Sequence, residues 1–415
     1  MSMLLRDVEV EGERVDVRID DGRITEIGTG LDAEETIEGR GGALLPGLHD
    51  HHLHLFALAA ARASIDVGTG LDALRGATGD WVRAVNARES VDRHVLDALV
   101  PDRPVRVQHR SGGLWMLNSV ALERVAHVLD DTADVERDPD GTPTGRLWRY
   151  DARLRPALPD SRVDLAAVVD ELHGYGITSV TDATPDLDAR AVSTLLALPL
   201  EVTLLGDPHG TAPRKLLLRD HDLPTYDDLA TTISATHAQG RAVAVHCVTR
   251  ESLLLTLAVL DGVGRSPGDR IEHAAVVPDP ELLRGLTVVT QPAFVTTRGD
   301  DYVRDVSPHD LPHLYPYAGL LAAGVHVLPS SDAPYGPVDP WQVIRAARDR
   351  DLGQDERVTT AVALAGYTTD SSGRSRQVRV GAPADLCLLH VPLAEALADP
   401  SAALVRRTGW SAHST

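Results

Sequence analysis

Closely spaced histidines are the residues of this sequence best suited to chemistry. The stretch "LHDHHLH" near the start of the chain contains His49, His51, His52 and His54. Because residues two apart in a strand share a face, His52 and His54 face one way, and His49 and His51 face the other. Imidazole nitrogen and carboxylate oxygen are ligands that zinc prefers, so the stretch is a candidate metal site.

Other side chains of this kind lie on later strand segments. Lys215 lies on the fourth, and His246, His273 and Asp332 stand where the fifth, sixth and eighth strands end. A single histidine at a strand end is more often a hydrogen-bonded core residue than a ligand, and an aspartate in "SSDAP" is also typical of a turn. The full set, in order along successive strands, favours a catalytic metal site with an open coordination position.

Strand-like segments must position these side chains, and most of them are followed by a helical pattern. Continuous apolar strands that alternate with helices predict a parallel sheet covered on both faces. Eight such units predict an α/β fold, a closed (β/α)8 barrel of the TIM type, with catalytic groups at the carboxyl ends of its strands. An open doubly wound sheet is the alternative, but no glycine-rich phosphate loop follows the first strand. The eight segments are "GALLPGLHDHHLHL", "GITSVTDAT", "LEVTLLGDP", "RKLLLRD", "RAVAVHCV", "RIEHAAVV", "LTVVTQPAF" and "VHVLPSSDAP".

The rest of the chain predicts two additions to this barrel. Residues 1–45 and 375–415 both contain short alternating strands, and we expect them to form one small β-sandwich domain. Residues 46–374 form the barrel domain. Within it, residues 57–165 are too long for an ordinary connection, and we expect a small helical cap insert there.

Composition limits the function classes. The chain has 415 residues and a formal net charge of −21, so nucleic acid and anionic membranes are poor partners. Its two cysteines, Cys247 and Cys387, lie in apolar segments that predict buried thiols rather than a disulfide. No signal peptide and no segment of about 18 apolar residues is present, so we expect a cytoplasmic protein.

Several motifs resemble a known family. "PGLHDHHLH" (46–54) is similar to the P-G-x-x-D-x-H-x-H opening of the amidohydrolase superfamily. The resemblance implies a metal-bearing barrel beside a β-sandwich built from both chain ends, with His52 and His54 rather than His49 and His51 as the metal pair. Further segments resemble its amidohydrolase-3, YtcJ-like branch: "LDALVPDRPV", "LNSVAL", "DGTPTGRL", "YGITSVTDA", "RIEHA", "SSDAPYGPVDP" and "VGAPADLCLL".

The resemblance also suggests a role for Lys215, the only lysine of the chain. Members of the superfamily carry a carboxylated lysine on the fourth strand, where Lys215 stands. Burial lowers the pKa of a lysine and supplies the neutral amine that reacts with CO2, which an arginine cannot do. The alternative is that one lysine remains there by chance.

The implied chemistry is metal-dependent hydrolysis of a C–N bond. The ligands would be His52, His54, Lys215 as its carbamate, His246, His273 and Asp332, around two divalent cations, zinc or else manganese or iron. A hydroxide shared by the cations would attack a carbonyl carbon, with Asp332 as the general base and then the general acid toward the leaving amine. We therefore expect an amidohydrolase acting on carbon–nitrogen bonds other than peptide bonds.

The substrate is less well determined. Gly113 stands where the family usually has a histidine, and Arg149 lies near a position that is often glutamate, which weakens any analogy with relatives. Aromatic and amide side chains predict a small, partly apolar or aromatic amide substrate, although each could instead pack the core. The candidate substrate-binding residues are Trp115, Gln291, Phe294 and Tyr302.

Two other functions remain open at this point. A deaminase of a cyclic amidine would use one metal and no carbamate, and would need a glutamate after the fifth-strand histidine. Glu251 follows His246 by five residues and fits that spacing poorly. A non-catalytic barrel used for assembly would have lost ligands, and none is missing. Barrels of this kind often pair, so we include a homodimer among the expectations.

Overall fold

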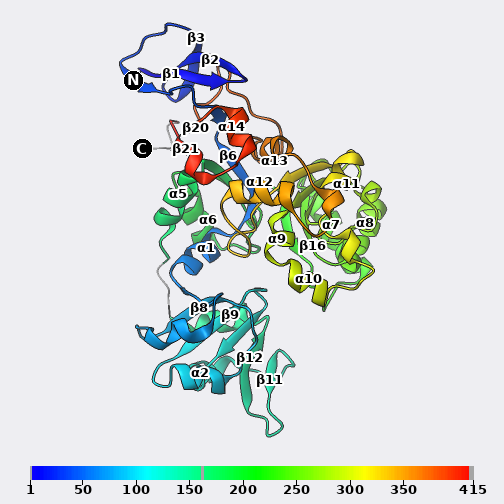
Figure 1. The fold of residues 1–415 in the computed structure, drawn as a ribbon. Helices are drawn as coiled ribbons and strands as arrows, with labels where there is room; N and C mark the ends of the chain where they lie inside the picture. Colours follow the sequence, from blue (N-terminus) through cyan, green and yellow to red (C-terminus); the bar gives the residue numbers. More distant parts are fainter. Residues whose placement is uncertain (1, 160–162, 411–415) are drawn as a thin grey trace. The chain divides into compact units, whose positions relative to one another are not determined.

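A computed structural model describes residues 2–159 and 163–410, which divide into two compact units (Figure 1). The first unit, here called the main unit, comprises residues 1–55 and 166–415. The second, here called the insert, comprises residues 56–165. Every residue predicted to bind metal belongs to the main unit.

Eight parallel strands form the centre of the main unit, and each lies within one of the predicted apolar segments. They are arranged in a three-stranded sheet, in the order β14-β13-β6, and a five-stranded sheet, in the order β15-β16-β17-β18-β19. Their interiors are buried on both faces, as continuous apolar strands require. The strands are β6 (Leu48–Leu53), β13 (Ile177–Asp182), β14 (Glu201–Leu204), β15 (Arg214–Leu217), β16 (Val243–Cys247), β17 (Arg270–His273), β18 (Thr287–Thr290) and β19 (His326–Pro329).

Individual backbone hydrogen bonds connect the two sheets. At one seam the amide of Lys215 donates to the carbonyl of Leu205, at 2.9 Å. At the other, the amide of Asp332 donates to the carbonyl of His52, at 2.8 Å. The strand ladders themselves do not close, so the parallel α/β architecture is established, whereas the closed barrel stays a prediction. The second seam brings the loop after β19 beside the histidines of β6.

Helices follow most of these strands, as the predicted alternation requires. Side-chain caps fix several of their starts: Thr249 begins α8 with a capping box to Ser252, and Asp339 begins α12 by accepting from the amide of Trp341. The helices are α5 (Leu165–Gly174), α6 (Ala189–Leu196), α7 (Tyr226–Ala238), α8 (Arg250–Val263), α9 (Ala293–Thr297), α10 (Gly299–Asp305), α11 (Tyr317–Ala322), α12 (Pro340–Asp349) and α13 (Thr360–Tyr367).

Both chain ends contribute to a pair of small sheets, which lie side by side in Figure 1. One sheet has the order β3-β2-β1-β4 and the other β21-β20-β5. Side chains from both sheets, such as Leu5, Val17 and Leu388, share one core. The strands are β1 (Ser2–Val10), β2 (Glu13–Asp20), β3 (Arg23–Gly28), β4 (Glu35–Glu38), β5 (Leu44–Pro46), β20 (Leu386–Leu389) and β21 (Val405–Thr408), with α14 (Leu393–Ala398) between the last two.

The first predicted strand segment is divided at Gly47. Residues before it form β5 in the sheet with β20, and residues after it form β6 in the parallel sheet. A Cβ atom at Gly47 would lie only 2.1 Å from Oγ1 of Thr178, so this crossing requires a glycine. A single residue therefore separates the end domain from the strand that carries the histidines.

The insert is not the helical cap that we predicted. It contains a six-stranded sheet in the order β11-β12-β10-β9-β8-β7. The segments "VRAVNA" and "VRVQH" place Val82, Ala84, Val105 and Val107 on one buried face, and this alternation favours strands over helices. The strands are β7 (Ile65–Asp66), β8 (Val82–Ala87), β9 (Val105–His109), β10 (Leu114–Leu117), β11 (Val135–Arg137) and β12 (Pro143–Trp148), and the helices are α1 (Leu55–Arg62), α2 (Arg93–Leu99), α3 (Ser119–Val125) and α4 (Asp151–Leu154).

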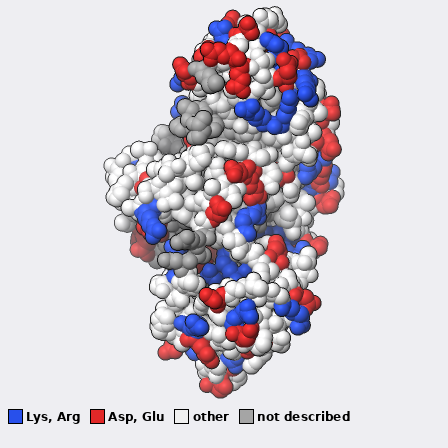
Figure 2. Space-filling model, turned by 90° about the vertical axis from the view of Figure 1, so that its left-hand side faces the viewer, with Lys and Arg blue, Asp and Glu red and all other residues white. Residues whose placement is uncertain are grey.

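Charges of both signs are interspersed on the face shown in Figure 2. The exposed positive charges are arginines, because the only lysine of the chain, Lys215, is buried. No helix among the described residues is long and apolar enough to cross a membrane.

Candidate active site

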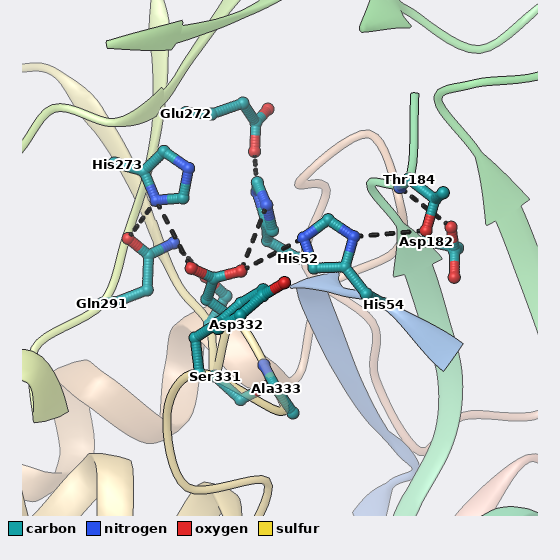
Figure 3. A network of polar contacts seen from close by, with 12 residues as sticks. His52, His54, Asp182, Thr184, Glu272, His273, Gln291, Ser331, Asp332 and Ala333 are labelled. Atoms are coloured by element: carbon teal, nitrogen blue, oxygen red, sulfur yellow. Dashed lines mark hydrogen bonds and ion pairs between the residues drawn. The ribbon is translucent and has the colours of Figure 1, made fainter. Parts of the chain in front are cut away.

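His52 of β6, His54 directly after it and Asp332 after β19 form a compact group (Figure 3). Oδ1 of Asp332 lies 3.3 Å from Nε2 of His54 and 3.6 Å from Nε2 of His52. One ligand atom from each of the three residues lies within 4.8 Å of the others. His52 and His54 share a face of the strand, as their spacing predicts.

The loop after β19 is held against β6 by backbone contacts. The carboxylate of Asp50 accepts the amides of His52, at 3.1 Å, and Ser331, at 3.2 Å. Asp332 itself has a φ of 51°, a left-handed conformation that costs energy in a residue other than glycine. The amide of Tyr335 donates back to the carbonyl of Asp332, at 2.8 Å, and stabilises this turn. These contacts direct the Asp332 carboxylate toward the two imidazoles.

The protonation states suit a cation. Burial alone would raise the pKa of Asp332, but the neighbouring imidazoles of His54, His52 and His273 outweigh it and lower that pKa, so the carboxylate is ionised. Burial and the nearby Lys215 lower the pKa of His52 to about 3, so this imidazole is neutral. Oδ1 of Asp332 is buried and accepts no hydrogen bond from the residues that the structure describes. A buried, unsatisfied carboxylate oxygen facing the neutral imidazole of His52 fits a divalent cation.

Glu272 holds His52 in place, a role that we did not predict. On β17 it is fully buried, and Nδ1 of His52 donates to its Oε2, while Nε of Arg270 donates to its Oε1. Burial would raise the pKa of Glu272, but Arg270, His52 and Lys215 lower it well below its usual range. An ionised carboxylate only accepts, so Nδ1 of His52 carries the proton and Nε2 presents its lone pair to the site. A carboxylate within a buried strand segment, "RIEH", was the signal in the sequence.

We expect Glu272→Gln to weaken metal binding by about 10- to 100-fold, because an amide holds the His52 tautomer less firmly than a carboxylate does. Competition with a chromogenic chelator would measure this change. The exposed Glu281→Gln, which loses only a surface pair with Arg284, is the matched control. Equal metal affinity in the two variants would show that Glu272 does not orient the ligand.

Lys215 lies beside this group, as its place on β15 predicts. Its Nζ is 3.4 Å from Nε2 of His52, and the residue is only 6% exposed. Burial lowers the pKa of Lys215, although the carboxylates of Glu272 and Asp332 oppose that shift. The sole lysine is thus a buried amine in contact with a candidate ligand.

The two remaining histidines continue the cluster. The ring of His273 lies 4.7 Å from that of His52 and 4.4 Å from that of His246, between centroids. Nδ1 of His273 lies 2.9 Å from Oε1 of Gln291 and 3.9 Å from Oδ2 of Asp332. Burial lowers the pKa of both His246 and His273. All six predicted ligands therefore meet in one place, with His52, His54 and Asp332 closest together.

The other histidine pair of β6 is structural. Ser179 and Thr181 of β13 contact both ring nitrogens of His49, at 2.8 and 2.9 Å. His51 contacts the carbonyl of Gly366, in α13, and the hydroxyl of Thr369, after that helix. These contacts face away from the candidate ligands His52 and His54, as the alternation along β6 requires.

The predicted substrate-binding residues have different surroundings. Gln291 is fully buried and uses its amide to join His273 to Ser330, so it positions a candidate ligand. Phe294 and Tyr302, on α9 and α10, belong to a hydrophobic cluster of the main unit. Trp115 is 3% exposed in the core of the insert, where its Nε1 donates to Asp151 at 2.6 Å. Their contact with substrate stays a prediction.

Residues 35–408 match the model of a protein family described as "Amidohydrolase family". The chain belongs to the amidohydrolase family. This amidohydrolase is 25% identical to N-substituted formamide deformylase of Arthrobacter pascens, over 90% of this chain and 89% of the relative. It is also 25% identical to the putative amidohydrolase YtcJ of Bacillus subtilis (strain 168), over 81% of this chain and 80% of the relative. The family assignment identifies the chain as an enzyme, a hydrolase.

A solved structure shares the fold of this amidohydrolase. It is an uncharacterized metal-dependent hydrolase from Pyrococcus horikoshii OT3, with a TM-score of 0.71 and 20% sequence identity. The similarity covers 98% of this chain and 99% of that one. It extends over both chain ends and the central sheets.

Proposed function

We propose that this amidohydrolase is a metal-dependent hydrolase of an amide C–N bond. The observation that carries the proposal is the group formed by His52, His54 and the ionised Asp332 beside the buried amine of Lys215. Imidazole nitrogens, a carboxylate and a second potential oxygen donor suit a hydrolytic metal site. The eight parallel strands would form one (β/α)8 barrel, with His52, His54 and Asp332 at the carboxyl ends of its strands.

The ligands of the metal would be His52, His54, His246, His273 and Asp332. A divalent cation, zinc or else manganese or iron, lowers the pKa of water and polarises a carbonyl when it is bound at such a site. Two ions are proposed because the cluster extends from His52 through His273 to His246, whose ring centroids follow each other at 4.7 and 4.4 Å.

Lys215 is proposed to carry a carbamate. Its neutral amine would attack the carbon of CO2, a C–N bond would form, and one proton would leave to solvent. The product has two oxygens that share one negative charge, where the free amine has no oxygen, and Nζ already lies 3.4 Å from Nε2 of His52. Burial favours this reaction because it lowers the pKa of the amine.

Asp332 is proposed to transfer the proton. Its ionised carboxylate would accept a proton from the attacking water and later donate it to the leaving amine. Its burial keeps bulk water from competing for that proton, and the turn from Asp332 to Tyr335 fixes its direction. Glu272, through His52, would keep the neighbouring imidazole deprotonated at Nε2.

The substrate series tests the proposal. We expect the purified, metal-supplied enzyme to release amine and carboxylic acid from some member of a panel of N-substituted formamides and N-acyl amines. Formamides come first because one relative is named N-substituted formamide deformylase. Chelation should abolish the activity and added zinc or manganese should restore it. Absence of amine release across the whole panel, from protein with bound metal, would contradict an amide substrate.

A deaminase of a cyclic amidine is the second candidate function. It would require a proton-transferring glutamate near His246, but Glu251 is exposed in the first turn of α8. This placement supports hydrolysis of an amide over deamination. Ammonia release from cyclic amidines in the same assay, without amide hydrolysis, would reverse that choice.

A further inference from the structure

A half-buried arginine lies near Asp332 without a carboxylate to neutralise it. Arg298 stands between α9 and α10. Among the residues that the structure describes, no carboxylate lies within ion-pairing distance of its guanidinium. The acidic residues that follow it are directed elsewhere, since Asp300 is exposed and Asp301 pairs with Arg304 at 3.1 Å. A partly desolvated cation without a counter-charge is costly, so its retention needs an explanation.

The Arg298 guanidinium contacts the loop after β19, which carries Asp332. The central carbon of the Arg298 guanidinium lies 4.0 Å from the centroid of the Phe294 ring, and Nη2 donates to the carbonyl of Tyr335 at 2.6 Å. Tyr335 in turn donates its amide to Asp332 and packs its ring edge-on, 5.9 Å from that of His54. Tyr335 therefore connects Arg298 to two candidate metal ligands, Asp332 and His54.

Two tyrosine hydroxyls accompany the arginine. The hydroxyl of Tyr302, on α10, lies 3.3 Å from that of Tyr315, and the two rings are 6.1 Å apart. Tyr302 is half-buried, and Tyr315 is 2% exposed. Burial raises the pKa of Tyr302, while the charge of Arg298 opposes the shift and that of Asp332 adds to it. The Tyr302 hydroxyl therefore stays neutral and can donate a hydrogen bond.

We propose that Arg298 and the hydroxyl of Tyr302 bind a carboxylate carried by the amide substrate. The inference rests on the proposed function and gives its substrate class: an acidic amide, with the carboxylate on either the amine or the acyl side. A guanidinium has five N–H donors, and the contact with Tyr335 uses one of them. Because the chain has a net charge of −21, its overall field repels an anionic substrate, and a fixed local cation is the means of holding one.

Paired substrates test this inference in the unmodified enzyme. One arm compares an N-acyl amino acid with the N-acyl amine that lacks its carboxylate. The other compares the monoamide of a dicarboxylic acid with the amide of the matching monocarboxylic acid. Because the carboxylate is on only one side of the amide, we expect one of the two arms to respond. In that arm, kcat/KM should fall by roughly 10- to 100-fold when the carboxylate is absent. Equal kcat/KM values in both arms would overturn the inference and leave amide hydrolysis intact, whereas no hydrolysis of any amide would reject the proposed function itself.

The arginine is tested by Arg298→Met, which keeps an extended side chain and removes the charge. It should lower kcat/KM for the acidic amide roughly 10- to 100-fold and leave the neutral amide within about threefold. Arg304→Met, on α10 and solvent-exposed, is the matched control and should change neither value. If Arg298→Met affects acidic and neutral amides alike, Arg298 only positions the loop through Tyr335, and the inference is wrong.

Discussion

Replacing Asp332 with asparagine is expected to lower kcat for amide hydrolysis by about 10²- to 10⁴-fold. The amide of asparagine keeps the shape of the side chain, but it cannot accept the proton of the attacking water, and it lacks the negative charge that faces His52 and His54. Steady-state kinetics with the best amide of the panel would measure the loss.

A matched surface variant separates this effect from a general loss of charge. Asp355→Asn changes an exposed carboxylate of the main unit and should retain full activity. Circular dichroism should show both variants folded, because the backbone hydrogen bonds that hold the turn at Asp332 do not involve the side chain that Asp332→Asn changes. Retention of more than about a tenth of the native kcat by Asp332→Asn would exclude this carboxylate as the proton-transfer group.

Replacing Lys215 with alanine is expected to lower kcat by roughly 10² or more, because the carbamate oxygens proposed to hold the cations would be lost. The variant also removes the amine that contacts Nε2 of His52. Labelling with ¹³C-bicarbonate should give a carbamate signal in the NMR spectrum of the native enzyme and none in Lys215→Ala.

Two further variants at this position separate the carbamate from positive charge. Lys215→Arg retains a cation but cannot be carboxylated, and should be as inactive as Lys215→Ala. Lys215→Glu supplies a carboxylate of its own and should recover part of the activity, without dependence on bicarbonate. An active Lys215→Arg would refute the proposed carbamate.

The sequence predicted the parts of the site whose residue types and spacing carry the signal. The His52–His54 alternation follows from the geometry of one strand, and His246, His273 and Asp332 stand at the ends of other strands. Glu272 could not be assigned in this way, because its partner His52 is 220 residues away and is reached only when β17 lies across from β6. The contacts between distant segments were therefore not predictable from local pattern.

The same limit explains why the sheet of the insert and the division of the first strand segment at Gly47 were not predicted. The alternation in "VRVQH" is short, and its pairing partners Arg106↔Leu117 and Ala84↔Val107 come from separate segments, so a sheet was missed and helices were predicted. The division at Gly47 depends on the side chain of Thr178, which no periodicity reveals. The prediction that the insert covers the site remains a prediction.

Metal analysis tests the central claim most directly, namely that His52, His54 and Asp332 hold a divalent cation. Native protein and a His52→Ala/His54→Ala double variant would be purified with zinc or manganese supplied, dialysed together, and measured by elemental mass spectrometry. We predict two metal ions per native chain and almost none in the folded double variant. A metal-free native chain, or equal metal content in the two proteins, would contradict the account.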